Sequence, residues 1–528
     1  MTSTGTGSPS APWGVIVIGG GPAGVSVATL LGQRGVRVVV VERHHDVYPL
    51  PRAVHLDDEV YRILYQLGVG EKFAALTRPA SGLRLVDGRH RELVTLPRAR
   101  RTAAGLPQAN MFDQPDLERL LRDNLEHHPE VTFLGGHELV RLDTTDPASV
   151  TAHLRRPDGS PMDLRAPYAI ACDGANSTVR GQLDIQNVDF GFEQRWLVVD
   201  IRCVPDLDAW EGVHQVCDTR RAGTFMRIGH DRYRWEFQLL EGESPTDYAS
   251  IPALRPLIGS WVRGVRDDRL TLLKSAEYTF RARVAQRWRD GRVFLVGDAA
   301  HVTPPFIGQG LCAGLRDAHN LAWKLAAVSH GLDAPELLNS YEAERRPHVT
   351  AMIKRAKAMG RLMTGGGWTA ALARRCLVPT LARSRFVRRI VLDSRTPALT
   401  PGPRVLRRTP GSVRGALLPL VRMPGPDGGL VLVDRVLGDR TTVVALPGVD
   451  LATVPGALPC AWLTVDPRSS DGERQLARWL RAAGVGWVRV DPDRVVVAAG
   501  PAGAGDRRGR GTGGGGAVSE DRFGIDQL

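Results

Sequence analysis

The sequence predicts an α/β fold whose first domain is built on a parallel sheet. The β-branched run Val15–Ile18 predicts a strand, and this strand ends in the glycine-rich turn 19–24. The pattern of Val25–Arg34 is helical, and a second β-branched run, Val36–Val41, ends at Glu42. Strand, glycine turn, helix and strand in this order are typical of the βαβ unit of a Rossmann-like, dinucleotide-binding domain.

Beyond this unit, the periodicity predicts alternating helices and strands with one β-rich section inserted among them. The β-rich section runs from about 196 to 280 and contains strand-like stretches at 196–201, 223–228 and 233–240. The helices and strands predicted outside it are 117–127, 131–134, 293–296, 310–328 and 337–363.

The last part of the chain predicts a separate small domain. An Arg- and Pro-rich stretch, roughly 374–412, indicates a connector. Short strand-like runs and one helical run, 473–483, follow it and predict a βαβ-type domain without a glycine-rich loop of its own. Residues 501–528 are of low complexity, rich in Gly and Arg, and are predicted to be disordered.

Composition excludes several classes of protein. The 528 residues are 43% hydrophobic and 24% charged, which excludes collagen-like, wholly disordered and polytopic membrane proteins. The net charge of +12 suggests nucleic-acid binding, but all except five of the 69 basic residues are Arg, and these are spread along the chain. We therefore expect neither nucleic acid nor a membrane as a partner.

The cysteines and the N-terminus predict a cytoplasmic protein. The six Cys form no CxxC and no Cys/His spacing typical of a metal site, so we expect neither a disulfide framework nor a metal. No basic region precedes an apolar stretch, which predicts no signal peptide. Residues 14–31 nearly reach the length of a membrane span, but the glycines and proline at their centre argue against one.

The first of three chemically informative motifs is Gly19-x-Gly21-x-x-Gly24. Gly19 permits a tight turn, Gly21 lets the backbone approach a pyrophosphate, and Gly24 lets the helix pack closely on the strand. The helix N-terminus offers N–H donors to phosphates, and Glu42 can accept from ribose hydroxyls. The motif predicts a dinucleotide, although by itself it does not separate FAD from NAD(P).

The other two motifs also follow short apolar strands. They are CDGANSTVR at 172–180 and GDAAH, PP and GQG within 297–310. Each by itself also fits an ordinary turn with an Asp or Ser cap before a helix. Asp298, however, stands at the carboxyl end of a buried strand, which is where doubly wound sheets bind their ligands.

In this order, the three motifs closely resemble the FAD fingerprints of the group A flavoprotein aromatic monooxygenases. Further similar segments are 51–53, 113–115, 288–295, 316–324 and 341–348. The resemblance covers about residues 14–500, and the wording PRAVHLDDE is most similar to the 3-(3-hydroxyphenyl)propionate hydroxylases of this family. It implies a discontinuous FAD-binding domain, an inserted mixed β-sheet substrate domain and a C-terminal thioredoxin-like domain.

The resemblance and the patterns together predict the domain boundaries. The predicted parts are a disordered N-terminus (1–13), an FAD-binding domain (14–185 plus 281–370), a β-rich substrate domain (186–280), a connector (371–412), a thioredoxin-like domain (413–500) and a disordered tail (501–528). The thioredoxin-like domain contains only Cys460, so we expect a structural or dimer-contact role and a homodimer rather than disulfide chemistry.

The resemblance also implies which residues bind the cofactors FAD and NAD(P)H. The resemblance implies that the glycine motif, Glu42 and Arg43 bind the ADP half of FAD. It implies that Arg52 lies by the pyrophosphate and that Gln114 and Asp298 flank the ribityl chain. The motif with Asp173 and Arg180 serves both FAD and NAD(P)H, for which no permanent pocket is implied. The flavin ring is expected near Pro305, Gly308, Gln309, Gly310 and Leu311, where a helix N-terminus would stabilise the reduced, anionic flavin.

The implied reaction is hydroxylation of a small phenolic substrate, ortho or para to its hydroxyl, by O2 through a C4a-hydroperoxyflavin. The candidate catalytic residues are His55, Tyr278 and Arg283, because a His near neutral pKa can take a phenolic proton. Each also fits a structural role, as a packed His, a half-buried strand aromatic and a surface charge. Arg227 and Arg234 are candidates for pairing a substrate carboxylate, although in a chain with 64 Arg any single one is more often a surface residue.

The same motifs are compatible with an alternative function, the hydroxylation of a polycyclic aromatic natural product or antibiotic. A flavin-dependent halogenase is disfavoured because the chain has no WxWxI stretch. The chain departs from the family after Gly310, where Leu311-Cys312 replaces the usual Met-Asn. Backbone donors survive that change, but the side chain that could cap the helix is lost, so we expect the flavin to be positioned differently from that in the relatives.

Overall fold

The computed structural model describes residues 12–365 except 103 and 219, and residues 397–501 except 408, 411, 451, 453 and 455–459. The predicted disordered ends, except for 12–13 and 501, and the connector residues 371–396, 408 and 411 lie outside this part. The contacts divide the chain into two units, one of 1–100, 107–334 and 352–395, the other of 101–106, 335–351 and 396–528. Within the described ranges, every helix is too short or too polar to cross a bilayer.

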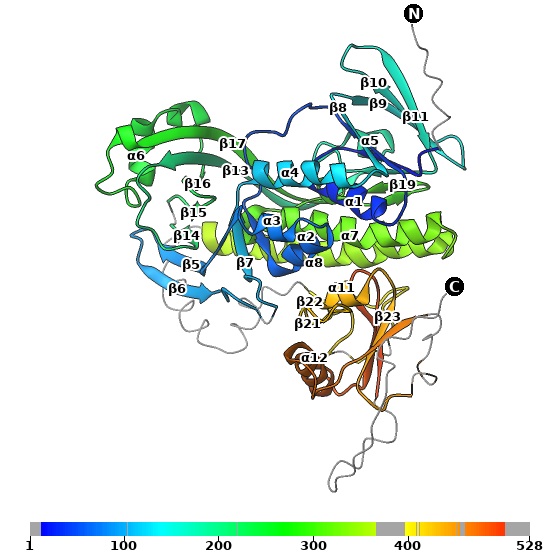
Figure 1. Ribbon diagram of the computed structural model, residues 1–528. Coiled ribbons are helices and arrows are strands. Elements are labelled where there is room, and N and C mark those ends of the chain that lie inside the picture. Colours follow the sequence, from blue (N-terminus) through cyan, green and yellow to red (C-terminus); the bar gives the residue numbers. More distant parts are fainter. Residues whose placement is uncertain are drawn as a thin grey trace, which may run out of the picture. The chain divides into compact units, whose positions relative to one another are not determined.

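The first unit contains a six-stranded sheet that carries the predicted βαβ unit (Figure 1). Across the sheet the strands are β18 (Arg289–Asp290), β19 (Val293–Leu295), β12 (Tyr168–Ala171), β1 (Val15–Ile18), β2 (Val38–Glu42) and β8 (Val131–Gly135). All neighbours are parallel except β18 and β19. Strand β1 has the sequence VIVI and is fully buried, as expected for a parallel strand that is covered on both faces.

Helix α1 (Pro22–Gly32) begins with Pro22, whose missing N–H costs nothing in the first turn. It ends before the predicted Arg34, because Gly35 takes a φ of +73° and the Val36 N–H donates to the Leu31 carbonyl at 3.1 Å. These two residues close the helix, so β2 begins at Val38 instead of Val36.

The remaining helices of the first unit connect and cover its sheets. They are α2 (Asp58–Gln66), α3 (Gly70–Phe73), α4 (Gln114–Asp123), α5 (Thr178–Gln182), α6 (Ile251–Ile258) and α7 (Gly310–Ser329), with 3₁₀ turns at 124–127, 245–248, 267–269, 297–299 and 305–307. A further turn at 335–338 leads into α8 (Asn339–Thr364), which continues through Pro347 and supplies residues to both units. Helix α1 packs on β1 and β2 of the six-stranded sheet, and α7 lies side by side with α1 (Figure 1).

The β-rich section forms most of an eight-stranded sheet in the same unit. Its strands, in order, are β20 (His301–Val302), β17 (Leu270–Ala285), β13 (Asn187–Cys203), β16 (Arg232–Gln238), β15 (Gly223–Arg227), β14 (Val213–Cys217), β5 (Gly82–Asp87) and β6 (Glu92–Pro97). The last two strands lie within the segment 14–185, which we predict to belong to the FAD-binding domain. Strand β5 instead pairs in parallel with β14, far away in sequence, and no local pattern predicts such a pairing.

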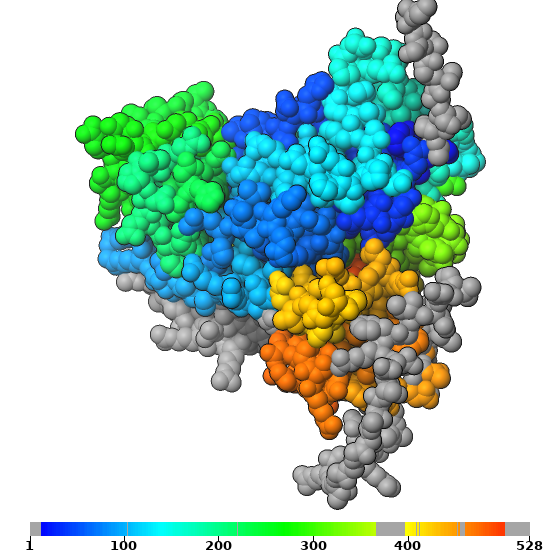
Figure 2. Space-filling view, viewed as in Figure 1, coloured from blue at the N-terminus to red at the C-terminus, as the bar shows by residue number. Residues whose placement is uncertain are grey.

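One face of this sheet packs on α6 through an aromatic core. Phe225, Tyr233, Trp235 and Phe237 are buried there together with Leu254 of the helix. Strands β14 to β17 and α6 lie in the green part of the surface in Figure 2, whereas β5 and β6 of the same sheet lie in the blue part. Because side chains alternate along a strand, the residues between these aromatics turn to the opposite face of the sheet.

Two small antiparallel sheets complete the first unit. One consists of β11 (Pro161–Ala166), β10 (Val150–Arg155) and β9 (Glu138–Asp143), and the other of β3 (His55–Asp57), β7 (Ala109–Phe112) and β4 (Thr77–Pro79). Strand β3 leads directly into α2, which is capped by the Asp57 carboxylate accepting from the Val60 N–H at 3.0 Å.

The second unit has a mixed sheet with its own core. A four-stranded sheet, β24 (Ala461–Thr464), β23 (Thr442–Ala445), β25 (Trp487–Val490) and β26 (Val496–Gly500), accompanies a hairpin of β21 (Arg422–Pro424) and β22 (Leu430–Leu432) and the helices α11 (Val433–Leu437) and α12 (Asp471–Ala482). Only β23 and β24 are parallel within the four-stranded sheet. Leu476 and Leu480 of α12 pack against Val444 and Val488 of that sheet in one buried cluster.

A buried charge network joins β3, α2 and α7 in the first unit. The Arg316 guanidinium donates to Asp57 at 2.6 Å and to the Gln309 amide oxygen at 3.0 Å, and it lies 2.8 Å from Glu59. Gln309 in turn donates to Asp57 at 3.0 Å. Burial by itself would raise the pKa of Asp57, but the charge of Arg316 and the hydrogen bonds lower it overall, so this carboxylate stays ionised.

We expect Arg316→Met to destabilise the protein by about 3–5 kcal/mol, because it leaves the buried Asp57 charge without its partner. Arg119→Met is the matched control, since the Arg119–Asp116 pair has side chains that are 55% and 42% exposed. That exposed pair should contribute less than about 1 kcal/mol. Urea unfolding followed by circular dichroism measures both effects, and equal shifts of the two midpoints would contradict the prediction.

Candidate functional site

The three glycines of the first motif meet different constraints. Gly19 has a φ of +106°, and a Cβ there would lie 2.4 Å from the Cys172 carbonyl oxygen. A Cβ on Gly24 would lie 1.9 Å from the Gly19 oxygen. A Cβ on Gly21, by contrast, would meet no atom within 4 Å, and its φ of −76° suits any residue. The space beside Gly21, at the N-terminus of α1, therefore fits a cofactor phosphate.

Glu42 holds the same turn from the end of β2. Its carboxylate accepts from the Gly20 N–H at 2.7 Å and from the His44 N–H at 2.9 Å. Arg122 of α4 reaches the Gly20 carbonyl at 3.2 Å from the other side. Arg43, which the resemblance assigns to the same end of FAD, is exposed, and its Nε lies 3.2 Å from His44 Nε2.

Asp298 is delivered by the third motif to the wall of a cavity. The preceding Gly297 has a φ of +63°, and its N–H points to Asp317 of α7 at 3.3 Å. The same carboxylate contacts His301 Nε2 at 2.7 Å, with both side chains fully buried. Asp298 is exposed to the cavity, and desolvation by the surrounding protein raises the pKa of its carboxyl.

The second motif is tied to the third by Arg180. Its guanidinium donates to the Ala299 carbonyl at 2.8 Å and to the Ala175 carbonyl at 2.9 Å. Asp173 accepts from the Val179 N–H at 3.1 Å through one oxygen, while its other oxygen is buried and has no partner among the described residues. Neither Asp173 nor Arg180 is among the residues that line the cavity.

Gln114, at the start of α4, positions the segment that carries Arg52. Its amide oxygen accepts from the Arg52 N–H at 3.0 Å and the Ala53 N–H at 2.6 Å, and its amide nitrogen donates to Glu118 at 2.6 Å. Arg52 itself lines the cavity, with its guanidinium over the ring of Tyr48. Because its amide already bonds to protein on both sides, Gln114 acts on the site through the backbone of Arg52.

The GQG turn brings its backbone against His55. Gly308 takes a φ of +61°, and a Cβ there would lie 2.9 Å from His55 Nδ1, so only glycine permits this approach. His55 Nδ1 is 3.4 Å from the Gly308 carbonyl oxygen, and desolvation by burial lowers the pKa of His55. Cys312, one turn into α7, is buried with its Sγ 3.7 Å from the same carbonyl oxygen.

These segments enclose a cavity of about 590 Å³. It is lined by predicted site residues from three parts of the sequence, namely Arg52, His55, Asp298, Pro305, Gly308, Gln309, Gly310 and Leu311. Apolar side chains, among them Val54, Met226, Phe306 and Met352, make up much of the remaining wall. The sheet contributes Gln215, Thr224 and Glu236, and α8 contributes Arg355.

The other two predicted catalytic residues lie outside this lining. Tyr278 is half-buried on β17, its hydroxyl accepts from Lys274 Nζ at 2.8 Å, and burial raises its pKa. Arg283 lies near the end of β17 and pairs with Asp189 at 3.0 Å, with its side chain 33% exposed. The structure therefore brings only His55 of the three to the cavity.

Arg234 is a candidate for pairing a substrate carboxylate, but its charge is already matched inside the protein. It is 1% exposed, and it donates to Asp200 at 2.7 and 2.9 Å and to the carbonyls of Pro51 and Arg52 at 2.6 and 3.1 Å. Lys274 donates to the Pro51 carbonyl at 3.2 Å, and desolvation by burial lowers its pKa to about 8. This cluster therefore anchors the backbone of the Arg52 segment.

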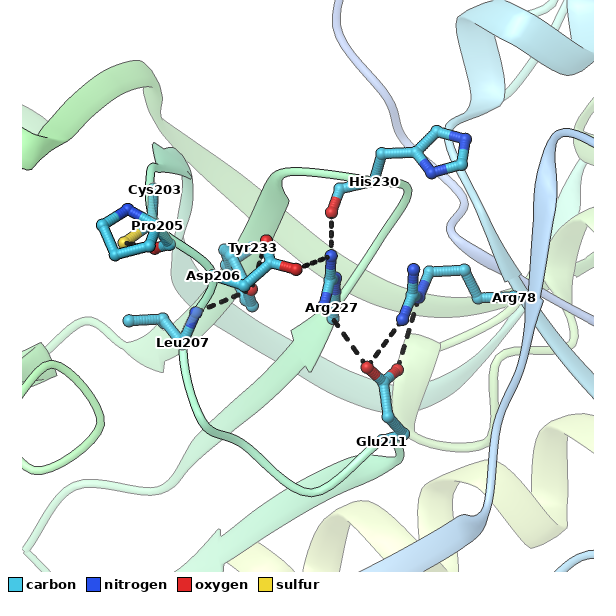
Figure 3. Close-up of polar contacts among 9 residues, drawn as sticks. All are labelled: Arg78, Cys203, Pro205, Asp206, Leu207, Glu211, Arg227, His230 and Tyr233. Carbon is cyan, nitrogen blue, oxygen red and sulfur yellow. Dashed lines mark hydrogen bonds and ion pairs between the residues drawn. The ribbon is translucent and has the colours of Figure 1, made fainter.

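Arg227 is likewise matched by protein carboxylates, as Figure 3 shows. Its guanidinium contacts Asp206 at 2.7 Å and Glu211 at 3.4 Å, and it also donates to the His230 carbonyl. Arg78 holds the same Glu211 at 2.7 Å. The two Nη atoms of Arg227 are therefore used within the protein, which does not favour Arg227 as a residue that pairs a substrate carboxylate.

Sequence reasoning missed the sheet residues of the cavity. The signal lies in the segment RYRWEFQ of β16, where buried aromatics alternate with charged residues. The alternation places Arg234 and Glu236 on the face opposite the aromatic core, and Glu236 lines the cavity. Which face would meet the site depends on the tertiary structure.

The chain is similar in sequence to known proteins. A family model described as FAD binding domain matches residues 13–356. The chain is 38% identical over 354 residues to a 3-(3-hydroxy-phenyl)propionate/3-hydroxycinnamic acid hydroxylase 2 of Burkholderia vietnamiensis, covering 66% of this chain and 63% of that protein. It is 36% identical over 357 residues to a probable NADH-specific resorcinol 4-hydroxylase of Rhodococcus jostii, covering 66% and 65%. The matched region is thus less than two thirds of either relative.

A solved structure matches over a longer stretch. The crystal structure of aklavinone-11 hydroxylase, in a ternary complex with FAD and aklavinone, is similar with a TM-score of 0.74 and 26% identity. The match covers 93% of this chain and 96% of that one. The chain therefore belongs to the FAD binding domain family, and its resemblance to the group A flavoprotein aromatic monooxygenases is confirmed.

Proposed function

We propose that this protein is an FAD- and NAD(P)H-dependent monooxygenase that hydroxylates a phenolic aromatic compound ortho or para to its hydroxyl. The observation that carries this proposal is the shared cavity, where Asp298 and the 305–311 segment face apolar and polar side chains of the β-rich sheet. A cofactor and an aromatic ring would meet there. The named activities of the relatives, on hydroxyphenylpropionate and resorcinol, support the same reaction class.

The protein's own groups would bind and orient the cofactor. The first-turn N–H groups of α1 and the open space at Gly21 would receive the phosphates, and Asp298 the ribityl chain. At α7 the Gln309 side chain makes no cap, because Asp57 and Arg316 hold its amide. The first N–H groups of α7 therefore stay available to an electron-rich edge of the flavin.

Bound FAD would supply hydride acceptance from NAD(P)H and the activation of O2 for transfer of one oxygen atom. The apolar wall, including Phe306, Ile307 and Met226, would exclude water from the reacting ring. His55 is proposed as a residue that contacts the substrate, because it lies at the junction of the β3 segment and the GQG turn. Its lowered pKa leaves the imidazole neutral at pH 7.

A polycyclic aromatic natural product is the second candidate substrate. The observation that favours it is the match to aklavinone-11 hydroxylase, which extends over most of both chains. The size of the accepted phenol separates the two candidates.

The finer organisation of the chain also belongs to this proposal. We infer a thioredoxin-like fold for 413–500, supported by the mixed four-stranded sheet with α12, and the domain division predicted above. Arg52 at the pyrophosphate, Gln114 as the support of Arg52, and Asp173 with Arg180 as the link to NAD(P)H are part of the same proposal. A homodimer and a cytoplasmic location stay predictions.

The test of the function begins with the purified protein, which should be yellow. It should oxidise NADH or NADPH rapidly only when a suitable phenol is present. Resorcinol, 3-(3-hydroxyphenyl)propionate and aklavinone form the panel, and mass spectrometry should find a product heavier by one oxygen atom. A colourless protein that cannot be reconstituted with FAD would contradict the proposal.

The glycines provide a test of the cofactor site. Gly21→Ala should leave stability nearly unchanged but weaken FAD binding at least about tenfold, because the new methyl occupies space that is open only for the phosphates. Gly24→Ala should instead lower stability by about 1–3 kcal/mol or more, because its Cβ meets the Gly19 oxygen. Flavin fluorescence and thermal unfolding of the apoprotein separate the two effects. Unchanged FAD affinity in Gly21→Ala would show that the phosphates bind elsewhere.

His55→Ala should reduce the yield of hydroxylated product per NAD(P)H oxidised, while the FAD content changes little. The reason is that His55 lines the cavity and is proposed to contact the substrate. The FAD content should change little because the contact of His55 Nδ1 with the Gly308 carbonyl oxygen is long, at 3.4 Å, so its loss should disturb the GQG turn little. Product and H2O2 are quantified together against NAD(P)H consumed. A coupled rate equal to that of the wild type would remove His55 from the catalytic set.

A further inference from the structure

Glu236 occupies the cavity face of the eight-stranded sheet. On β16 its neighbours Trp235 and Phe237 are buried in the aromatic core, so the Glu236 side chain turns to the opposite face. It pairs directly across from Thr224 of β15, which pairs with Gln215 of β14. All three line the cavity, so one row across the sheet presents a carboxyl, a hydroxyl and an amide to its contents.

The charges beside Glu236 are matched without it. Arg234 is held by Asp200 and by two backbone carbonyls, and Lys274 by the Pro51 carbonyl and the Tyr278 hydroxyl. The nearest charged contact of Glu236 is Arg234 Nη1, 4.0 Å from Oε1. Within the described part of the chain, no group donates a hydrogen bond to its carboxyl. A ligand with an O–H donor would supply the missing partner.

The electrostatic surroundings favour proton uptake at this carboxyl. Burial raises the pKa of Glu236, Arg234 lowers it, Asp200 raises it and Lys274 lowers it, and the net shift is upward. The remaining charged or titratable side chains of the cavity are Arg52, His55, Arg98, Asp298 and Arg355. His55 has its pKa shifted the other way, so its protonated form is disfavoured. Glu236 is thus a stronger base than an ordinary carboxylate, and His55 is a weaker one than an ordinary imidazole.

We propose that Glu236 binds the hydroxyl group of the aromatic substrate and accepts its proton. This inference rests on the proposed function and names the residue that activates the phenol. The O–H bond breaks, the proton passes to a carboxylate oxygen, and the electron pair stays on the phenolate oxygen, which enriches the ortho and para carbons. After the ring carbon has gained its oxygen and lost its own proton to solvent, the Glu236 proton returns to the phenolate oxygen. The O2 and NAD(P)H of the proposed reaction supply the oxygen atom and the electrons.

The experiment compares FAD-loaded wild type, Glu236→Gln and Glu236→Asp, with Glu241→Gln as the matched control. Glu241 is exposed just beyond β16, so the same loss of charge there should leave the activity unchanged. Resorcinol and 3-(3-hydroxyphenyl)propionate are the probes. Product formation and NAD(P)H oxidation are measured from about pH 6 to about pH 10, where a phenol ionises without help.

Glu236→Gln should lose about 10²–10⁴-fold of its hydroxylation rate near pH 7, while it still binds FAD and oxidises NAD(P)H. The loss should shrink as the pH approaches the pKa of the phenol, because solvent then removes the proton. A purely structural role would not produce this recovery. Glu236→Asp should keep part of the activity near pH 7.

The proposal would be overturned if Glu236→Gln hydroxylated the phenol at the wild-type rate at pH 7. It would also be overturned if the loss of hydroxylation rate were the same at every pH. If Glu236→Gln cannot be loaded with FAD, the comparison of Glu236→Asp with Glu236→Ala tests the proposal. Near pH 7, Glu236→Asp must hydroxylate the phenol and Glu236→Ala must not. At high pH, Glu236→Ala must regain activity. A wild type that hydroxylates neither phenol refutes the proposed function itself. An active wild type with an unchanged Glu236→Gln profile refutes only the role of Glu236.

Discussion

The short segment Pro51–Asp57 is pinned at both ends by buried charges, and the site depends on this constraint. At one end, Arg234 and Lys274 of the eight-stranded sheet donate to backbone carbonyls of Pro51 and Arg52. At the other end, Asp57 is held by Arg316 and Gln309 at the start of α7. The segment therefore connects the sheet and the helix, both of which contribute residues to the cavity, and its own Arg52 and His55 line the same cavity.

Such a use of charge has an energetic logic. A buried ion pair adds little net stability compared with apolar packing, but loss of one partner is costly, so it enforces one arrangement of the backbone. Asp57 shows the principle, since it caps α2, pairs with Arg316 and accepts from Gln309 at once. Because Gln309 is diverted into this network, it leaves the N-terminus of α7 uncapped. The same network that holds the fold together thus leaves the first backbone N–H groups of α7 without a side-chain cap.

Several of the charged side chains near the site are neutralised by partners within the protein. Arg227, Arg234 and Arg283 are each paired with a carboxylate of the protein. His55 and Glu236 lie on the cavity wall together with Arg52, Arg98, Asp298 and Arg355, and burial shifts the pKa values of His55 and Glu236 in opposite directions. Burial disfavours the charged form of each group, so it makes the imidazole a poorer base and the carboxylate a better one.

The βαβ unit, the glycine spacing, the order of the three motifs and the family follow from local sequence patterns and from close backbone approaches that only glycine permits. The neutralisation of particular arginines, the pairing of β5 with β14 and the exposure of Glu236 to the cavity depend instead on how distant segments pack together. The alternation in β16 indicates two faces but not which one meets the site. Pairing between distant segments has no local signature, since it arises from the packing of the whole unit.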